Sequence, residues 1–404
     1  MLLKLAWRNI WRNRNRSLIT MSAIASAVLL AIITVSLQKG VWNNLVKNLV
    51  SLYTGYVQVH AKGYWAEQTL DNSFETSDSL ESLVRQTPGV IHLSPRLETF
   101  ALASSGDKTR GCLVVGIDPA AEDTLTQLTP KIQSGAMLHA GSETALLAEG
   151  LAAKLNLGIR DTAVLLTQGY YGNTAAMKVV ISGLLRFGAP ELNDRVAYVS
   201  LPVAQQWLDA PGRATSMVLG LQNAQQLKPV AASLRKRLPG DFEALTWEEM
   251  MPEITQHIEA DSAGMYIMLG VLYLLISFGI FSTLLMMLAE RQREFGMLLA
   301  LGMHPASIAR VLLAETIFLT LCGCLAGILI SWPVVWYLKE HPIEFTGELA
   351  KAYENFGFQA IFPAILKARI FIEQTLIVLG VGIVLAIYPV WRVLHIKPVR
   401  AMRQ

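Results

Sequence analysis

The chain has 404 residues, of which 52% are apolar and 16% are charged, and its formal net charge is +3. This composition excludes an ordinary soluble protein, because it is too apolar, and a chain that lies wholly within a membrane, because it is too polar. The small net charge excludes the broad basic footprint of a nucleic-acid-binding protein. We therefore expect a few membrane spans and a sizeable water-exposed domain. The segments described below specify an α-helical membrane protein with four transmembrane helices and a mixed α/β extracytoplasmic domain.

Residues 1–16 are predicted to form a cytoplasmic amphipathic helix that lies in the membrane interface. Apolar residues recur there at helical spacing, and a second face is basic at every fourth position: Leu3, Trp7 and Ile10 on the first, Lys4, Arg8 and Arg12 on the second. Tryptophans beside a basic face are typical of interfacial helices. The alternative is a run of positive charge before the first span, without a defined helix.

Four apolar segments are long enough to cross a membrane. They are residues 17–38, 265–289, 311–338 and 372–391. Arginine and lysine gather in the regions that precede the first span, separate the second from the third, and follow the fourth. The positive-inside rule therefore places these regions in the cytoplasm, as the N-terminal helix, an elbow at 290–310 and a tail at 392–404. The domain 39–264 and an outer loop at 339–371 are then extracytoplasmic.

The segment 39–264 is long enough to form a folded domain. Alternating and β-rich runs predict strands, and amphipathic runs predict helices. The predicted strands are 55–60, 91–115 with a break at 106–107, a strand near 144, 164–167, 177–183, 196–199 and 242–245. The predicted helices are 77–86, a helix that ends at Gly158, 222–238 and 250–261.

The elbow is dense in charge in its first half and apolar in its second. Gly302 is typical of a helix end and Pro305 of the first position of a new helix. A helix–Gly–X–X–Pro–helix elbow can sit in a groove of another protein, which would cover apolar side chains such as Phe295 and Leu301. The alternative is an ordinary solvated loop between two spans.

Glu315 lies about one turn into the third span, where a carboxylate is costly unless it meets other helices, water or a cation. It ties the elbow to the span in one interpretation. In the other, the span begins after it and the carboxylate stays at the interface. Gly323 and Gly327 have the spacing that permits close helix contact, which is weak support for a dimer seam. Pro389 is expected to kink or end the last span.

No catalytic constellation is present in the sequence. It contains no nucleotide-binding P-loop motif, no His-Glu-X-X-His and no Gly-X-Ser-X-Gly. The cysteines Cys112, Cys322 and Cys324 lack metal or redox spacing and are assigned to packing, and His304 is interpreted as a helix cap. We expect a non-catalytic protein that binds neither a metal nor a cofactor of its own.

The order of residues in the elbow resembles that of FtsX-like permeases, the MacB-type membrane subunits of ABC transporters, and in particular the LolC/LolE lipoprotein-releasing branch. The resemblance rests on Glu290-Arg291-X-Arg293-Glu294-Phe295-Gly296, Leu298-X-Ala300-Leu301-Gly302 and Glu315, although the family has Ile where Phe295 stands. Further similar segments are 5–13, 55–60, 148–158, 388–392 and 397–403.

The resemblance implies a function. Such a permease uses mechanotransmission, driven by a cytosolic ATPase dimer that holds ATP and Mg, to move its extracytoplasmic domain. It releases or exports an amphiphile, and the LolC/LolE branch implies lipoproteins from the bacterial cytoplasmic (inner) membrane. The alternative is an FtsX-type regulatory permease that controls a periplasmic partner without transport. A second permease copy or homologue, the lipid membrane and a periplasmic carrier or adaptor are the other implied partners, and nucleic acid is not.

The resemblance also suggests site residues. The ATPase-coupling surface would contain Glu290, Arg291, Arg293, Glu294, Phe295, Gly296, Leu298, Leu301 and Gly302, with Glu294 as the best single candidate. A β-rich insertion near 100–210 would carry a short loop that contacts substrate or carrier through Gln168, Tyr170, Tyr171 and Asn173.

Overall fold

The structure is a computed structural model that describes residues 2–12, 14–188, 190–348, 350 and 361–395. Parts of the predicted outer loop and tail, including the segment 397–403, lie outside the described residues. The chain divides into two compact units, which we call the helical unit and the sheet unit. The helical unit contains residues 1–43, 258–344 and 361–404, and the sheet unit contains residues 44–257 and 345–360.

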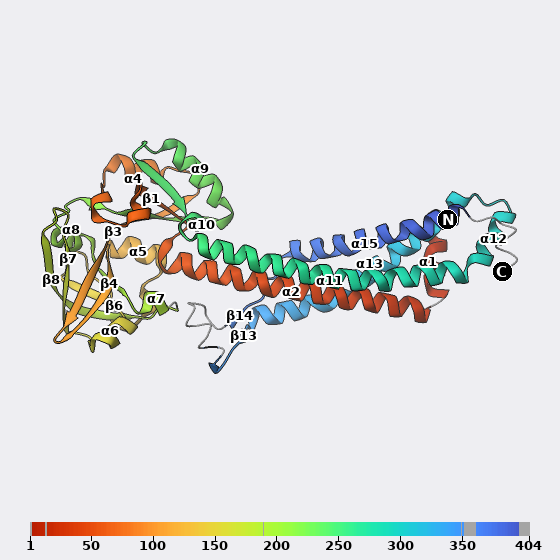
Figure 1. Cartoon of the computed structure of the whole chain (residues 1–404), viewed down its shortest axis with the longest axis horizontal. Helices are drawn as coiled ribbons and strands as arrows, with labels where there is room; N and C mark the ends of the chain where they lie inside the picture. Colours follow the sequence, from red (N-terminus) through yellow and green to blue (C-terminus); the bar gives the residue numbers. More distant parts are fainter. Residues whose placement is uncertain (1, 13, 189, 349, 351–360, 396–404) are drawn as a thin grey trace. The chain divides into compact units, whose positions relative to one another are not determined.

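Long helices dominate the helical unit. Its elements are α1 (Leu2–Arg12), α2 (Arg14–Leu49), α11 (Pro252–Glu290), α12 (Gln292–Ala300), α13 (Pro305–Glu340), β13 (Ile343–Glu344), β14 (Ile361–Phe362) and α15 (Ala368–Leu394). By length and composition, α2, α11, α13 and α15 can cross a membrane. The four predicted spans fall within these helices. Figure 1 shows α1 and α12 together at one end of this unit, with the β13–β14 pair toward the other.

Helices α2 and α13 approach each other closely through glycines of α13. A Cβ atom at Gly323 would lie 2.8 Å from Ile24 side-chain atoms, and one at Gly327 would lie 2.9 Å from the Ala25 carbonyl oxygen. These glycines therefore serve a contact within the chain, in place of the dimer seam considered from their spacing. Helix α15 continues through Pro389 to Leu394, so of the two outcomes expected for this proline the end of the helix does not occur.

A short strap of residues 363–365 joins α2 to α13 away from the elbow. The backbone N–H of Ile365 donates to the Ser36 carbonyl at 3.0 Å, and that of Ala364 donates to the Leu338 carbonyl at 3.4 Å. Gly40 lies directly under the Pro363 carbonyl, where any side chain on α2 would collide with the strap. The strap thus connects the two helices through backbone hydrogen bonds.

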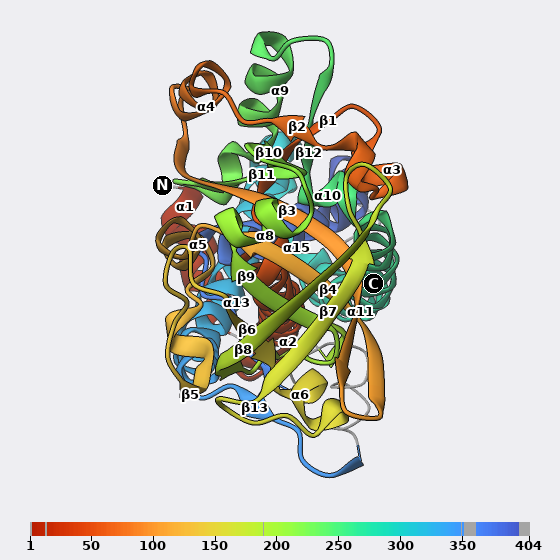
Figure 2. The same ribbon diagram turned by 90° about the vertical axis from the view of Figure 1, so that its left-hand side faces the viewer.

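Ten strands among the described residues of the sheet unit form one sheet, in the order β12-β1-β11-β3-β4-β9-β6-β8-β5, with β7 between β3 and β8. They are β1 (Val57–Ala61), β3 (Val90–Ser105), β4 (Lys108–Ile117), β5 (Ile132–Gly135), β6 (Thr144–Ala148), β7 (Thr162–Gln168), β8 (Thr174–Leu185), β9 (Val196–Ser200), β11 (Ser216–Leu221) and β12 (Phe242–Thr246). Strands β2 (Phe74–Glu75) and β10 (Arg213–Ala214) form a separate pair. Most pairs are antiparallel, but β4–β9 and β6–β8 are parallel. Figure 2 looks onto the long strands β7 and β8.

The helices of the sheet unit are short. They are α3 (Tyr64–Glu67), α4 (Asp78–Arg85), α5 (Pro119–Thr126), α6 (Glu149–Leu155), α7 (Pro190–Asn193), α8 (Leu201–Trp207), α9 (Leu227–Arg237) and α10 (Trp247–Met250), with the π-helix η1 (Val50–Thr54) and the 3₁₀ turns η2 (Leu70–Asn72), η3 (Thr129–Lys131) and η4 (Ala224–Gln226). The predicted strands and helices correspond to observed elements, including the break at 106–107 between β3 and β4. Helices α5 and α8 and strand β11 were not predicted. Strand β11 is buried on both faces, so its sequence does not alternate.

A buried polar cluster joins strand β3 to helix α5 and to η1. Arg96 Nη2 lies 2.6 Å from Glu122 Oε1, and both side chains have no solvent exposure. Ser94 Oγ donates to Glu122 Oε2 at 2.8 Å, and Arg96 Nη1 donates to the Tyr53 carbonyl at 2.6 Å. Every charged atom of Arg96 and Glu122 therefore has a hydrogen-bond partner, which offsets part of the cost of burying an ion pair. Glu98 Oε1 lies farther from Arg96, at 3.8 Å.

Candidate functional site

The elbow has the architecture predicted from its glycine and proline. Helix α11 ends at Glu290, α12 follows, and Gly302 adopts φ +91°, a left-handed conformation that favours glycine. His304 then caps α13, because its Nδ1 accepts a hydrogen bond from the backbone N–H of Ala306 at 3.2 Å, and Pro305 is the first residue of that helix. The prediction of a helix–Gly–X–X–Pro–helix elbow is confirmed.

A buried ion pair ties the elbow to α13. Arg291 Nη1 lies 2.7 Å and 2.8 Å from the two carboxylate oxygens of Glu315, and these side chains are 6% and 1% exposed. The side-chain amide N–H of Asn9, in α1, donates to Glu315. The backbone carbonyl of Asn9 accepts a hydrogen bond from Arg291 Nη2 at 3.2 Å. The structure therefore contains the contact that the first interpretation of Glu315 requires, and it adds α1 to it. We call Asn9, Arg291 and Glu315 the polar lock.

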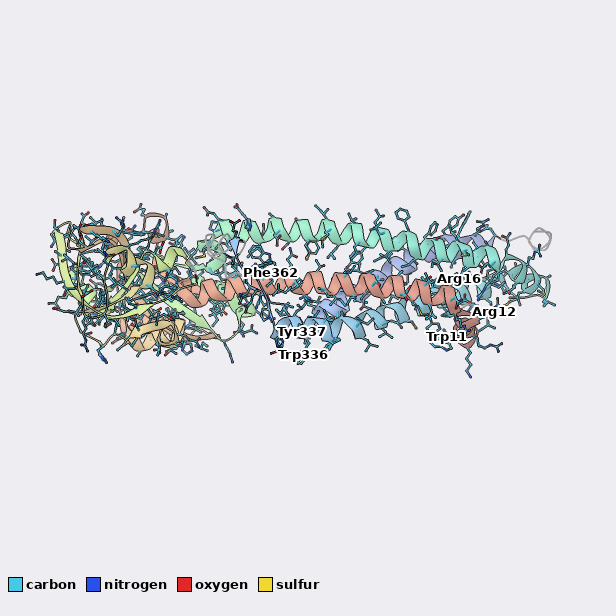
Figure 3. All side chains as sticks on the ribbon, turned by 90° about the horizontal axis from the view of Figure 1, so that it is seen from below. Trp11, Arg12, Arg16, Trp336, Tyr337 and Phe362 are labelled. Atoms are coloured by element: carbon cyan, nitrogen blue, oxygen red, sulfur yellow. The ribbon has the colours of Figure 1, made fainter. Side chains whose placement is uncertain are left out.

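Exposed ion pairs flank the polar lock. Arg12 Nη2 lies 2.7 Å and 2.8 Å from the carboxylate oxygens of Glu294, and Arg16 pairs with Glu290. The Arg12 and Glu294 side chains are 56% and 45% exposed, so the pair contributes at most about 1 kcal/mol to stability. Figure 3 shows Trp11, Arg12 and Arg16 at the same end of the helical unit.

The predicted coupling residues divide between a buried and an exposed set. Arg291, Phe295 and Gly296 are buried, whereas Glu290, Arg293, Leu301 and Gly302 are exposed, and Glu294 and Leu298 lie between. Phe295 packs into the apolar core of the helical unit. The expectation that a partner must cover Phe295 is therefore wrong, although Leu301 remains 79% exposed.

Helix α1 packs on the beginning of α13. The rings of Trp7 and Phe318 meet edge to face with centroids 5.9 Å apart, and Trp7 contacts Trp11 in the same manner at 6.1 Å. Apolar side chains of α1 nevertheless remain open, since Leu3 is 62% exposed and Trp11 51%. Open apolar side chains beside basic residues favour the interfacial helix over an unstructured charged run.

The loop between β7 and β8 is short and held in place. The N–H of Gly169 donates to the Asn173 carbonyl at 2.8 Å, and Asn173 Nδ2 donates to Asp209 Oδ2 at 3.0 Å. The guanidinium of Arg213 stacks on the Tyr170 ring at 4.3 Å, which leaves Tyr171 as the protruding side chain at 78% exposure. Gln168 is the last residue of β7, so the predicted loop residues form one compact tip.

No group of three or more metal-ligand side chains occurs among the described residues. Cys112 and Cys324 are buried in apolar surroundings, and burial raises the pKa of the Cys112 thiol to about 12. Asn9, Arg12 and Arg16 were missed as site residues. Arg12 and Arg16 are four residues apart, as are their partners Glu290 and Glu294, and this matched spacing was a signal available in the sequence.

Comparison with known families and proteins identifies the class of the chain. The model of the MacB-like periplasmic core domain matches residues 17–237, more than half of the chain, and the model of the FtsX-like permease C-terminal region matches residues 266–398. The lipoprotein-releasing system transmembrane protein LolC of Xylella fastidiosa (strain 9a5c) is 26% identical over 333 residues, which cover 80% of each chain. LolE of Haemophilus influenzae is 24% identical over 76% of this chain and 74% of its own.

Among solved structures, the periplasmic region of MacB from Actinobacillus actinomycetemcomitans aligns with 54% of this chain and 98% of its own, with 12% identity and a TM-score of 0.37. The family matches cover the sheet unit through one model and the elbow with the three later long helices through the other. The chain therefore belongs to the family of FtsX-like permeases with a MacB-like periplasmic core domain, which are membrane subunits of ABC transporters.

Proposed function

We propose that this permease moves its extracytoplasmic domain by mechanotransmission from a cytosolic ATPase and thereby releases or exports an amphiphilic substrate. Lipoproteins of the bacterial inner membrane are the favoured substrate, because the relatives LolC and LolE carry the name of lipoprotein-releasing proteins. The observation that carries the proposal is the polar lock, which joins the elbow to α1 and α13.

The polar lock gives the elbow a mechanical role. A force on α12 reaches Arg291 at its start, and Arg291 is held by Glu315 inside α13. Separating that pair would leave an uncompensated buried charge, at a cost of about 3–5 kcal/mol. Moving α13 together with the elbow avoids this cost, so the push is passed to the helix.

The remaining assignments follow from this role. The elbow and both termini lie in the cytoplasm, where the exposed residues Glu290, Arg293, Glu294 and Leu301 meet the ATPase dimer. ATP and Mg are held by that dimer and not by this chain. A second permease copy or homologue completes the complex in the membrane. The loop tip with Tyr171 is the candidate contact for a periplasmic carrier or adaptor.

A charge-reversal series at the elbow tests the proposal. Glu294→Lys should reduce co-purification of the ATPase found with the wild-type chain and its stimulated turnover more than tenfold, since leaving a charge unpaired in a docked interface costs about 2–5 kcal/mol. Glu340→Lys is the matched control, because Glu340 is an exposed glutamate at the other end of α13. Full coupling in Glu294→Lys would show that the elbow is not the coupling surface.

The internal partner of Glu294 makes a second control necessary. The double variant Arg12→Glu/Glu294→Lys restores an opposite-charge pair within the chain but reverses the charge that the ATPase meets. We expect it to remain defective. If coupling returns in the double variant, Glu294 acts only through Arg12. Normal coupling without release of any lipoprotein would instead favour an FtsX-type regulatory permease.

A further inference from the structure

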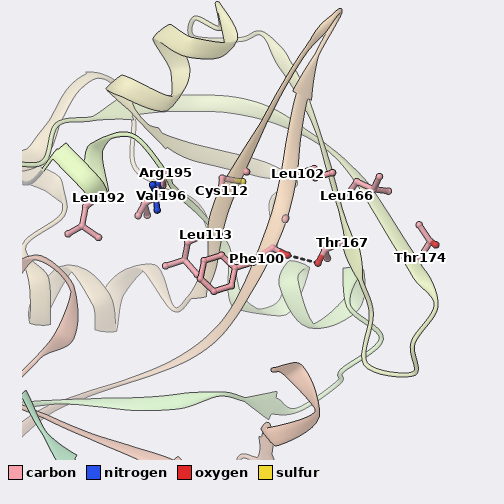
Figure 4. A pocket seen from close by; sticks show the side chains of 12 residues that line it. Phe100, Leu102, Cys112, Leu113, Leu166, Thr167, Thr174, Leu192, Arg195 and Val196 are labelled. Carbon is pink, nitrogen blue, oxygen red and sulfur yellow. Dashed lines mark hydrogen bonds between the residues drawn. The ribbon is translucent and has the colours of Figure 1, made fainter. Parts of the chain in front are cut away.

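An open apolar pocket of about 880 Å³ lies on the sheet unit. Phe100 and Leu102 of β3, Leu113 of β4 and Leu166 of β7 line it, and Arg195 stands at its side just before β9 (Figure 4). The volume is within the range of protein sites for small ligands. The pocket is distant in sequence from the elbow and plays no part in the coupling described above.

The strand register explains why the pocket wall is apolar. Phe100 pairs with Leu113 across β3 and β4, and Leu102 pairs with Leu166 across β3 and β7. The alternate residues of these strands face the other side, where they form a core with α6 and α8. Because no helix of that core covers the pocket side, Phe100 is 61% exposed, Leu102 48% and Leu166 39%.

An apolar wall on the water-facing side of an antiparallel sheet requires an explanation. Such a side normally carries polar residues, and a contiguous apolar patch usually marks a binding site. Gly111 pairs with Leu102 and adds depth, since a side chain there would project into open space. Three strands thus supply one continuous apolar surface with a hollow beside it.

Arg195 supplies a cation next to this surface. Its side chain is exposed and forms no ion pair or hydrogen bond with any of the residues that the structure describes. The adjacent Asp194 is occupied by Lys154 at 2.6 Å. A guanidinium without a partner binds carboxylate or phosphate oxygens well, often through two parallel hydrogen bonds.

We propose that this pocket binds the acyl chain of an amphiphile with an anionic head group, with the chain on the β3–β4–β7 surface and the head group on Arg195. Strand β4 has a free edge at residues 108–112, which pair with β3 alone because the pairing with β9 begins at Leu113. A peptide added there would lie beside the sheet and leave the apolar face of β3 and β7 uncovered, so it does not account for this surface. As the substrate class of the transporter the inference rests on the proposed function, but as a binding site it can be tested without the ATPase.

Photolabelling of the full chain in phosphatidylcholine nanodiscs, without ATPase or nucleotide, tests the site. The probe is palmitic acid with a photoreactive diazirine in its chain, and labelled peptides from β3, β4 and β7 are quantified by mass spectrometry. We expect labelling of these strands that falls at least tenfold in Leu102→Glu. Ile91→Glu is the matched control, because Ile91 is also an exposed apolar residue of β3 but does not line the pocket.

The head-group assignment has its own comparison. Arg195→Glu should lower labelling by the acid at least fivefold and leave labelling by the corresponding alcohol unchanged, whereas Arg110→Glu, at an exposed arginine of β4 outside the pocket, should change neither. An equal response of acid and alcohol overturns the role of Arg195.

Absent labelling of these strands, or undiminished labelling in Leu102→Glu, overturns the site. The acyl-chain site is also overturned if a protein chain, and not the probe, is found bound at Leu102. Hydrogen exchange confirms that each variant is folded. If the wild-type chain is labelled but does not couple to an ATPase, the binding site stands and the proposed function is wrong.

Discussion

Arg96 with Glu122 in the sheet unit, and Arg291 with Glu315 in the helical unit, are buried ion pairs of nearly the same length. Their closest nitrogen–oxygen distances are 2.6 Å and 2.7 Å. The partners around them differ. Arg96 lies within one domain, because its other contacts are Glu98 of β3 and the backbone carbonyl of Tyr53 in η1. Arg291 connects the ends of helices α1, α12 and α13.

This difference indicates two uses of the same chemistry. Burying a charge pair costs desolvation free energy, so neither pair is strong evidence for added stability. In the sheet unit the pair fixes which segments of one domain meet. In the helical unit it fixes which helix segments are held together, and by the proposed function these are the segments that would move together. Removing the pair in the sheet unit should therefore destabilise that domain, whereas removing the pair in the helical unit should separate the elbow from α13.

The largest expected effect comes from removing one glutamate at a time. Glu122→Ala should lower the opening free energy of β3 and α5 by about 3–5 kcal/mol, because it leaves Arg96 buried without its partner. Amide hydrogen exchange there would become about 100-fold faster or more. Glu315→Ala should accelerate exchange in α12 and abolish stimulated ATPase turnover, without changing β3. Equal acceleration of exchange in β3 by both variants would contradict the distinction.

A substitution in α13 separates the polar lock from the packing of the same helix. Gly323→Ala places a Cβ 2.8 Å from Ile24, so α2 and α13 must shift apart, at a cost of about 1–3 kcal/mol. The thermal unfolding midpoint of the full chain should fall. Gly380→Ala is the matched control, because a Cβ there meets no atom within 4 Å. If ATPase stimulation persists in Gly323→Ala but not in Glu315→Ala, the lock and not the helix contact carries the force.

The third effect is a pH dependence confined to the sheet unit. His60 Nε2 contacts Gln58 Oε1 at 2.7 Å, and burial lowers the pKa of His60 to about 3. The unfolded state then binds more protons between pH 3 and the usual histidine pKa of about 6.5. His60 therefore contributes its full stabilisation above pH 6.5 and loses it as the pH falls, by up to about 1.4 kcal/mol per pH unit.

His60→Leu should flatten this slope between pH 7 and pH 5, measured by hydrogen exchange of β1. His139→Leu is the control, because His139 is an exposed histidine of the same unit. The exchange of α12 should be the same in both variants. An unchanged slope in His60→Leu would mean that other groups set the acid response of the sheet unit.

The spans and the elbow could be predicted from the sequence because they depend on local patterns. Hydropathy locates a helix that can cross a membrane, and Gly302 with Pro305 marks the stop and start around the elbow. The position of Glu315 in an apolar run was compatible with a buried carboxylate and with one at the interface. Its partner Arg291 is 24 residues away, and Asn9 is 306 residues away, so only the folded chain brings them together.

The pocket and the Arg96 cluster could not be predicted for a related reason. The pattern of residues 91–115 predicts strands, but it does not say which face of a strand another helix will cover. Whether Phe100 or Ala101 faces the core depends on where α6 and α8 pack. In the same way, Arg96 in a strand is compatible with a solvated edge until α5 brings Glu122 beneath it.

Under the proposed mechanotransmission, the strap at residues 363–365 bears on how far α13 would move. It fastens the far part of α13 to α2, while the polar lock fastens the beginning of α13 to the elbow. A helix of 36 residues held at two distant points behaves as a stiff lever about 54 Å long. Tilting such a lever by about 5° sweeps one end sideways by about 5 Å, roughly the rise of one helical turn. A stroke of a few ångströms at the elbow therefore corresponds to a tilt of α13 by only about 5° and requires no helix to unwind.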